Sequence, residues 1–297
     1  MLWRVEQPAH VLTLTGHLQG LSDAAWAPDG RYLCTASDDQ TVRVFDCTTG
    51  QVLRTFRGHQ SYVCCCAYSP RGNIVASGSY DETIKLWDVR TARCLRSFGS
   101  HSDPITGLDF SWDGSLLASS SFDGLCRVWD AVAGTCIKTL LVDSNPFAFV
   151  VHKPRLPFRC CSLSHHHTVA PQRDRTYVKF TPNSKYLLAS YLDSTLRLWC
   201  YERAQCLREF TGHTAAKYSA AAAFLCSSAT GNCVVCGSED GRVCVWDVDR
   251  AALRTSWDAH TTAVLGVDCH PTQPLVATGA MGPDSTVKLW SWKAAAQ

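Results

Sequence analysis

One spacing recurs six times along this 297-residue chain. An aspartate precedes an aromatic residue by six positions in Asp39–Phe45, Asp81–Trp87, Asp123–Trp129, Asp193–Trp199, Asp240–Trp246 and Asp284–Trp290. Successive aromatic positions are separated by 42, 42, 70, 47 and 44 residues. A period of this length is typical of repeat architectures, in which each repeat is one supersecondary unit that stacks on its neighbours. The spacing therefore limits the fold to a repeat architecture before any single strand or helix is assigned.

Each repeat reads as a set of short strands. Apolar and polar residues alternate in Thr83–Trp87 and in Thr195–Trp199, which predicts strands with one buried face. Turn residues such as Pro28–Gly30 and Asp113–Ser115 separate these strands. We predict an all-β fold of four-stranded antiparallel units that stack around an axis, because one such sheet cannot bury both of its faces. The complete repeats are predicted at about 9–46, 51–88, 93–130, 135–200, 205–247 and 252–291.

Closure of the ring depends on the two ends of this pattern. Leu2 and Trp3 align with the end of a repeat's third strand and are interpreted as a remnant of a seventh repeat. The last repeat reaches Trp290 with no fourth strand after it, and an open edge exposes unpaired backbone groups. We therefore expect residues 9 to 14 to pair as the outer strand of the last repeat.

The fourth repeat is 28 residues longer than the 42-residue period, which predicts an insertion at about 147–175. The insertion contains several basic residues, Cys160–Cys161 and His165–His167, so binding of a metal or an acidic partner stays open. We favour a mobile loop without a packing role, because long unstructured loops are unusual inside compact domains. The whole chain, residues 1–297, is then one domain.

Glycine–histidine pairs open several repeats, and tryptophan–aspartate pairs close them, as at Gly58–His59 and Trp87–Asp88. In this the chain resembles the WD40 family, whose members are β-propellers. The resemblance implies a hydrogen-bonded tetrad of histidine, serine or threonine, aspartate and tryptophan inside each blade. In two repeats the tetrads are His59, Ser77, Asp81 and Trp87, and His101, Ser119, Asp123 and Trp129. The fourth repeat has Asp143 and Ala189 at two tetrad positions, and the fifth has Cys236.

The same histidines, serines and aspartates could also be taken for a nucleophilic triad. A nucleophile does not need several near-copies, whereas a repeated structural clamp does. None of these serines lies in a GxSxG elbow. We therefore predict that the protein is not an enzyme and needs no cofactor.

Composition narrows the classes of partner. Lys+Arg 28 and Asp+Glu 26 give a formal charge of +2, so no strong field favours direct binding to nucleic acid or to a membrane surface. The longest apolar runs are far shorter than the ~20 residues of a membrane helix, and the start of the chain does not resemble a secretory signal.

The 17 cysteines are not spaced as a disulfide framework. Cys233 and Cys236 form one CxxC without a second half-site, so no metal is expected.

Several local runs narrow the resemblance further, among them 78–83, 101–104, 123–130, 237–240 and 269–272. They are similar to the WD40 subfamily that scaffolds COMPASS-type histone H3 lysine 4 methyltransferase complexes. This implies a non-catalytic nuclear scaffold in chromatin regulation that binds a SET-domain methyltransferase subunit, a second propeller subunit and the histone H3 tail. The alternative is a diverged WD40 adaptor of another complex, such as a ubiquitin ligase, a splicing complex or a cytoplasmic assembly.

The resemblance also implies two binding surfaces. The axial pocket for an arginine or peptide comprises Gly20, Ser22, Asp23, Asp38, Cys64, Tyr80, Thr106, Phe122, Thr176, Ser219, Ala221 and Leu265. In the subfamily two phenylalanines sandwich the arginine, and Cys64 and Ala221 stand at those positions here. A cation over an aromatic face gains ~0.5 to 2 kcal/mol, so we expect arginine capture to be badly weakened.

The second surface is a groove for an acidic and apolar segment of the second propeller subunit. Its residues are Asn183, Tyr186, Leu198, Arg208 and Phe224. A cation beside aromatic and aliphatic side chains suits such a segment. The alternative, that Leu198 and Phe224 are ordinary blade core, stays open.

Overall fold

The computed structural model describes residues 1–4, 9–99, 101–141, 177–218, 221–227, 231–271 and 273–291. All regular elements in these ranges are β-strands. The described part of the chain contains no helix long and apolar enough to cross a membrane. The predicted insertion at 147–175 lies outside the described residues, as do Asp143, Thr176 and Ser219.

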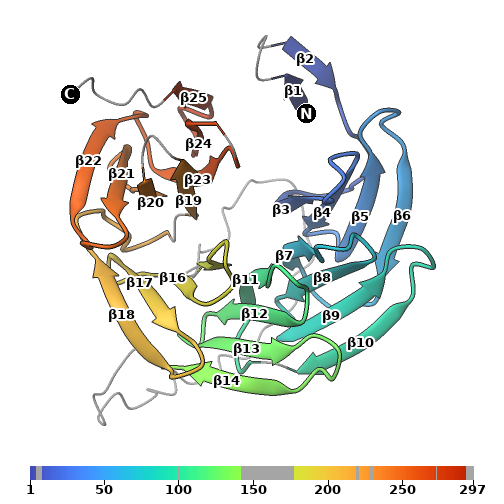
Figure 1. Ribbon diagram of the computed structural model, residues 1–297. Coiled ribbons are helices and arrows are strands. Elements are labelled where there is room, and N and C mark those ends of the chain that lie inside the picture. The colour runs from blue at the N-terminus through green and yellow to red at the C-terminus, as the bar shows by residue number, and fades with distance from the viewer. Residues whose placement is uncertain are drawn as a thin grey trace, which may run out of the picture.

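The strands form antiparallel sheets in chain order around an axis (Figure 1). Blade 1 comprises β3 (Leu21–Trp26), β4 (Tyr32–Ser37), β5 (Thr41–Asp46) and β6 (Val52–Arg57). Blade 2 comprises β7 (Val63–Tyr68), β8 (Ile74–Ser79), β9 (Thr83–Asp88) and β10 (Cys94–Gly99), and blade 3 comprises β11 (Ile105–Phe110), β12 (Leu116–Ser121), β13 (Cys126–Asp130) and β14 (Cys136–Leu140).

The second half continues the pattern. Blade 4 comprises β15 (Tyr177–Phe180), β16 (Leu187–Tyr191), β17 (Thr195–Cys200) and β18 (Gln205–Phe210), and blade 5 comprises β19 (Ala222–Ser227), β20 (Gly231–Gly237), β21 (Arg242–Asp247) and β22 (Leu253–Asp258). Blade 6 has three described strands, β23 (Val264–Cys269), β24 (Leu275–Ala280) and β25 (Val287–Ser291). The prediction of an all-β propeller with six repeats is confirmed.

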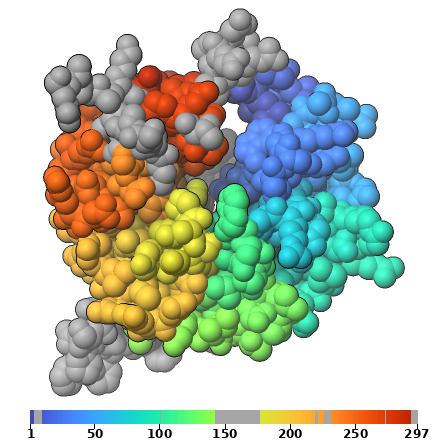
Figure 2. Space-filling model, viewed as in Figure 1, coloured from blue at the N-terminus to red at the C-terminus, as the bar shows by residue number. Residues whose placement is uncertain are grey.

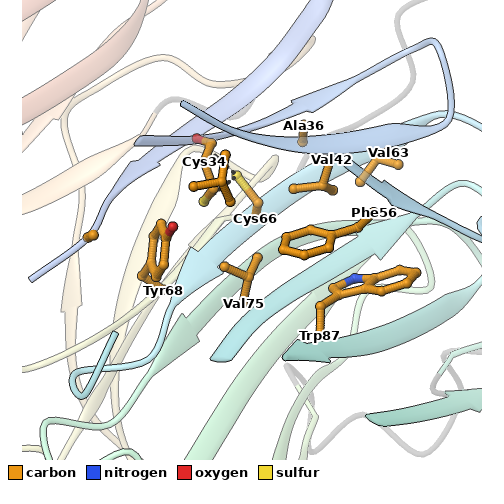
Figure 3. Packing of buried hydrophobic residues seen from close by; sticks show 11 residues of the cluster. Cys34, Ala36, Val42, Phe56, Val63, Cys66, Tyr68, Val75 and Trp87 are labelled. Atoms are coloured by element: carbon orange, nitrogen blue, oxygen red, sulfur yellow. Dashed lines mark hydrogen bonds between the residues drawn. The ribbon is translucent and has the colours of Figure 1, made fainter. Parts of the chain in front are cut away.

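Neighbouring blades are held together by apolar side chains between their sheets. Figure 3 shows this packing between blades 1 and 2, where Phe56 of β6 stacks on Trp87 of β9 with ring centroids 5.4 Å apart. Cys34 and Cys66 meet in the same cluster, with their Sγ atoms 3.5 Å apart. Blades 5 and 6 also approach closely, because a Cβ at Gly237 would collide with the carbonyl oxygen of Val264.

The expected pairing of residues 9 to 14 with the last blade is wrong. Instead, β2 (Ala9–Leu12) pairs with β1 (Leu2–Arg4) in a separate two-stranded sheet. Only a few residues separate these two strands, so their hairpin closes with a small loss of chain entropy. Pairing with β25 would need the two ends of the ring to meet, and Figure 1 shows them apart. Figure 2 shows the corresponding opening between the first (blue) and last (red) blades.

The cysteines whose side chains are described are free thiols. Those in the strand cores are buried, namely Cys34, Cys65, Cys66, Cys126, Cys233, Cys236 and Cys244. Others on outer strands are exposed, namely Cys94, Cys136 and Cys206. The remaining described cysteines, Cys47, Cys64, Cys200 and Cys269, are partly buried.

Candidate functional site

The histidine, serine and aspartate of the second and third repeats meet inside their blades. In blade 2, His59 Nδ1 lies 2.9 Å from Asp81 Oδ2 and His59 Nε2 lies 2.7 Å from Ser77 Oγ. Trp87 Nε1 donates to the same hydroxyl at 2.7 Å. Burial alone would raise the pKa of Asp81, but hydrogen bonds from His59 and Thr83 hold it below its ordinary value. The serine hydroxyl bonds two partners and is fully buried, so the arrangement is a clamp.

Blade 3 repeats this geometry, and blades 1 and 6 vary it. His101 lies 2.8 Å from both Asp123 and Ser119, and Trp129 Nε1 donates to Ser119 at 2.8 Å. In blade 6 the hydroxyl belongs to Thr278, and in blade 1 Phe45 stands where the other tetrads have tryptophan. The clamp therefore tolerates threonine for serine and loses one hydrogen bond with phenylalanine.

Blade 5 lacks the tetrad hydroxyl because Cys236 replaces it. Neither ring nitrogen of the buried His213 has a hydrogen-bond partner among the described residues. Trp246 Nε1 donates instead to the carbonyl oxygen of Thr211 at 2.8 Å. Burial lowers the pKa of His213, so its neutral form is favoured in the folded protein.

At the rim of the channel, where β3 begins, three of the predicted pocket residues lie together. Ser22 Oγ donates to Asp38 Oδ1 at 2.9 Å, and the Asp38 amide donates to the Gly20 carbonyl at 3.0 Å. A Cβ at Gly20 would lie 3.2 Å from Asp38 Oδ2, so glycine leaves the approach to this carboxylate open. The result is a small, acidic recess on blade 1.

A row of aromatic rings continues the rim over blades 2 and 3. Tyr80 lies edge-on between Tyr62 and Phe122, with centroid distances of 6.1 and 6.2 Å. Tyr62 is 48% exposed and was not among the predicted pocket residues. Its place three positions after Gly58–His59 is the signal that could have identified it. An acidic recess beside an aromatic row can hold a cationic, extended peptide.

The other predicted axial residues have different surroundings. Asp23 Oδ2 accepts the Cys66 amide at 2.9 Å and so links blades 1 and 2. Thr106 bonds Ser120 within blade 3 at 3.2 Å, and the Ala221 amide donates to the Leu265 carbonyl of blade 6 at 2.9 Å. Cys64 is partly buried, with its thiol directed to the Tyr62 carbonyl at 3.8 Å.

The predicted second groove lies between blades 4 and 5. Leu198 is only 4% exposed and belongs to the core between these blades, with the partly buried Tyr186 and Phe224 packed against it. Asn183 is exposed, but its side-chain oxygen accepts hydrogen bonds from Thr181 and Lys185 and thereby holds the turn.

Arg208, the cation of this groove, forms hydrogen bonds within the protein. Arg208 Nε donates to the Asp249 carbonyl at 3.3 Å, and its Nη1 donates to the Leu207 carbonyl at 2.8 Å. The guanidinium therefore links blade 4 to a turn of blade 5. The exposed polar groups of this surface lie over apolar side chains that also form the core between blades 4 and 5.

Comparison with known proteins places the repeats in one family. The model of the "WD domain, G-beta repeat" family, WD40, matches residues 8–46, 50–88, 92–130, 159–200, 204–247 and 252–291. The fourth match begins inside the predicted insertion. WD40 propellers are generally non-catalytic and bind other proteins.

Individual relatives are similar over part of the chain. WD repeat domain-containing protein 83 is 35% identical in Homo sapiens and 34% in Mus musculus over 111 residues, which is 37% of this chain and 33% of each relative. GID complex subunit 7 of Schizosaccharomyces pombe is 27% identical over 125 residues, 42% of this chain and 24% of that protein. The alignments thus span a third or less of these relatives, and they do not support the histone methyltransferase subfamily in particular. Because the family matches cover most of the sequence, the chain belongs to the WD40 repeat family.

Proposed function

We propose that this protein is a scaffold that binds extended segments of partner proteins at the rim of its channel. The observation that carries the proposal is the acidic recess of Gly20, Ser22 and Asp38 beside the aromatic row of Tyr62 and Tyr80. Exposed aromatic side chains next to a fixed carboxylate are the composition of a binding hot spot. The tetrad serines Ser77 and Ser119 are buried and hydrogen-bonded, so they do not offer a nucleophile at this surface.

As the specific assembly, we propose a histone H3 lysine 4 methyltransferase complex. The support is the set of local sequence runs that resemble its scaffold subunit. The proposed partners are a SET-domain subunit and the histone H3 tail at the rim, and a second propeller subunit at the groove of Tyr186, Phe224 and Arg208. A nuclear location follows from the same proposal.

An adaptor of a different complex is the second candidate. Cys64 and Ala221 favour it, because they remove the two aromatic walls that the methyltransferase scaffolds use for arginine. The relatives include a subunit of the GID complex, which also gives weight to a different assembly. Affinity purification of the tagged protein from cells, followed by mass spectrometry, separates the two. Recovery of SET-domain subunits supports the first candidate, and their absence beside another stable assembly supports the second.

Calorimetry with an arginine-bearing histone H3 peptide tests the rim. We expect weak binding by the unmodified protein and a gain of about fivefold or more in the Cys64→Phe, Ala221→Phe double variant, since each face contributes ~0.5 to 2 kcal/mol. Asp38→Asn should reduce binding by the double variant, because it removes the carboxylate of the recess. Tight binding by the unmodified protein, or no gain in the double variant, contradicts this account of the rim.

A further inference from the structure

The innermost strands of four blades carry ionisable side chains around the axis. They are Asp23 on β3, Asp109 on β11, Tyr177 and Lys179 on β15, and Asp268 on β23. Lys179, Asp109, Asp23 and Asp268 all influence the pKa of Tyr177, so these charges lie near one another. Three carboxylates accompany one ammonium, and the net charge of this group is therefore negative at pH 7.

Asp109 of this group lines a cavity of about 740 Å³ at the end of the channel opposite the rim. The cavity lies among the turns that join the first and second strands of blades 1 to 4. Phe110 and Phe180 line it and are only 7% and 5% exposed, whereas the indole of Trp112 at its edge is 79% exposed. The cavity thus combines an apolar interior with an accessible aromatic ring.

Asp109 is the acidic group that lines this cavity from the channel side. Its Oδ2 accepts the Phe180 amide at 2.7 Å, which fixes the carboxylate in place. Burial raises the pKa of Asp109 to about 6, and Lys179 opposes the rise. Lys179 Nζ also lies 3.7 Å from Asp268, so its charge is shared between two carboxylates. Asp109 is therefore mostly ionised at pH 7 and only partly compensated.

The mouth of the cavity carries one charge of each sign. Asp113 accepts hydrogen bonds from Ser111 and Ser115, which lower its pKa to about 2. Arg71, from the neighbouring turn, also lines the cavity and is exposed. These two charges offset one another, so the uncompensated charge is the negative one in the interior. Charge complementarity favours a cationic occupant.

We propose that this cavity binds a lysine or arginine side chain from an extended segment of a partner protein. The aliphatic stem packs against Phe110 and Phe180, since long basic side chains bury their methylenes along apolar surface. The cationic head lies at Asp109, and the Trp112 indole offers a cation–π contact at the mouth. The site is at the opposite end of the channel from Asp38 and Tyr80, so it does not depend on the function proposed for the rim.

The test uses the full chain and three matched heptapeptides of glycine and serine with lysine, arginine or norleucine at the centre. Norleucine keeps most of the stem of lysine and removes the charge. Binding is followed by NMR through the Trp112 indole signal, which is assigned by its loss in Trp112→Phe. We expect saturable shifts with the lysine and arginine peptides and none with norleucine. Equal shifts with all three peptides, or no shift with any, overturn the proposal.

Two charge-matched variants test the role of Asp109. Asp109→Asn should weaken binding of the lysine peptide by about tenfold, because it removes a partly desolvated counter-charge. Asp29→Asn removes the same charge from the turn after β3 of blade 1, where Asp29 corresponds to Asp113 and does not line the cavity, and should leave the affinity within about twofold. Equal affinities in the two variants overturn the proposal. If Asp109→Asn does not fold, Trp112→Ala replaces it, with an expected loss of about threefold read from the Gly114 amide.

Discussion

His213 differs from the other described tetrad histidines because it is buried without a hydrogen-bond partner among the described residues. Two differences account for this. Cys236 carries sulfur where blades 2 and 3 carry the hydroxyls of Ser77 and Ser119, and Asp240 accepts from Arg242 Nε at 2.7 Å and does not pair with His213 Nδ1. An unsatisfied buried polar group costs about 1–3 kcal/mol. Blade 5 therefore contains a local defect, and a hydroxyl at position 236 can supply a partner for one of the two ring nitrogens.

Cys236→Ser should stabilise the protein by about 1 kcal/mol, because the new hydroxyl can bond His213 Nε2 as Ser77 bonds His59. Urea unfolding measures the change in the free energy of unfolding. Cys233→Ser is the matched control, since it places a hydroxyl on the same strand away from the tetrad, and it should destabilise. A loss of stability in Cys236→Ser would show that the serine does not rebuild the clamp.

Stability should also fall as the pH drops below about 6.5. Burial lowers the pKa of His213 in the folded state, so the unfolded chain binds the proton more readily. The contribution is present above the unfolded pKa and is lost on acidification, with a slope of at most about 1.4 kcal/mol per pH unit. The measurement is the free energy of unfolding at pH 7.5, 6.5 and 5.5. The slope should be smaller in Cys236→Ser, and an equal slope would contradict the assignment to His213.

Equivalent residues on the innermost strands β3 and β11 differ in burial, because β3 has a neighbouring blade on one side only. Leu21 pairs with Ser37 at the start of β3, as Ile105 pairs with Ser121 at the start of β11. Leu21 is 61% exposed, and Ile105 is fully buried. The difference arises because β11 packs against a blade on each side, whereas β3 faces the opening of the ring.

The substitutions Leu21→Ser and Ile105→Ser should therefore differ in cost although the positions correspond. Ile105→Ser should lower the free energy of unfolding by about 3–4 kcal/mol, and Leu21→Ser by less than about 1 kcal/mol. Chemical denaturation of both variants checks this. Equal costs would mean that another surface covers β3 in solution.

On the scale of the whole molecule, stability should decline toward the opening. Val287 and Leu289 of β25 are 76% and 45% exposed, and no strand among the described residues pairs with the outer edge of β25. The four-stranded sheet of blade 2 packs against blade 1 on one face and blade 3 on the other. Regions with few buried contacts open locally at low free energy.

Hydrogen exchange should show this gradient directly. Amides of β25 and of the β1–β2 hairpin should exchange at least about tenfold faster than amides of β8 and β12, which corresponds to an opening free energy lower by about 1.4 kcal/mol. Mass spectrometry of proteolytic fragments after timed labelling measures the rates. Uniform protection around the ring would show that the opening is closed in solution.

The sequence by itself determined the repeat number and the four-stranded antiparallel unit of each blade, and its resemblance to a known family identified the tetrad partners of blades 2 and 3. These properties are local, because a period of two fixes which face of a strand is buried and the spacing within one repeat fixes which side chains meet. The missing hydroxyl of blade 5 could be predicted from Cys236, whereas the pairing of Asp240 with Arg242 could not. Tyr62 was missed although its sequence position signalled it.

Only the tertiary structure decided how the ends meet and what the channel contains. Strand β2 pairs with β1 and not with β25, because strand pairing across the ring depends on the angles between all the blades. The grouping of Asp23, Asp109, Lys179 and Asp268 was likewise outside the reach of the sequence. These residues come from four blades that are distant along the chain, and only the stacking of the sheets around one axis brings their charges together.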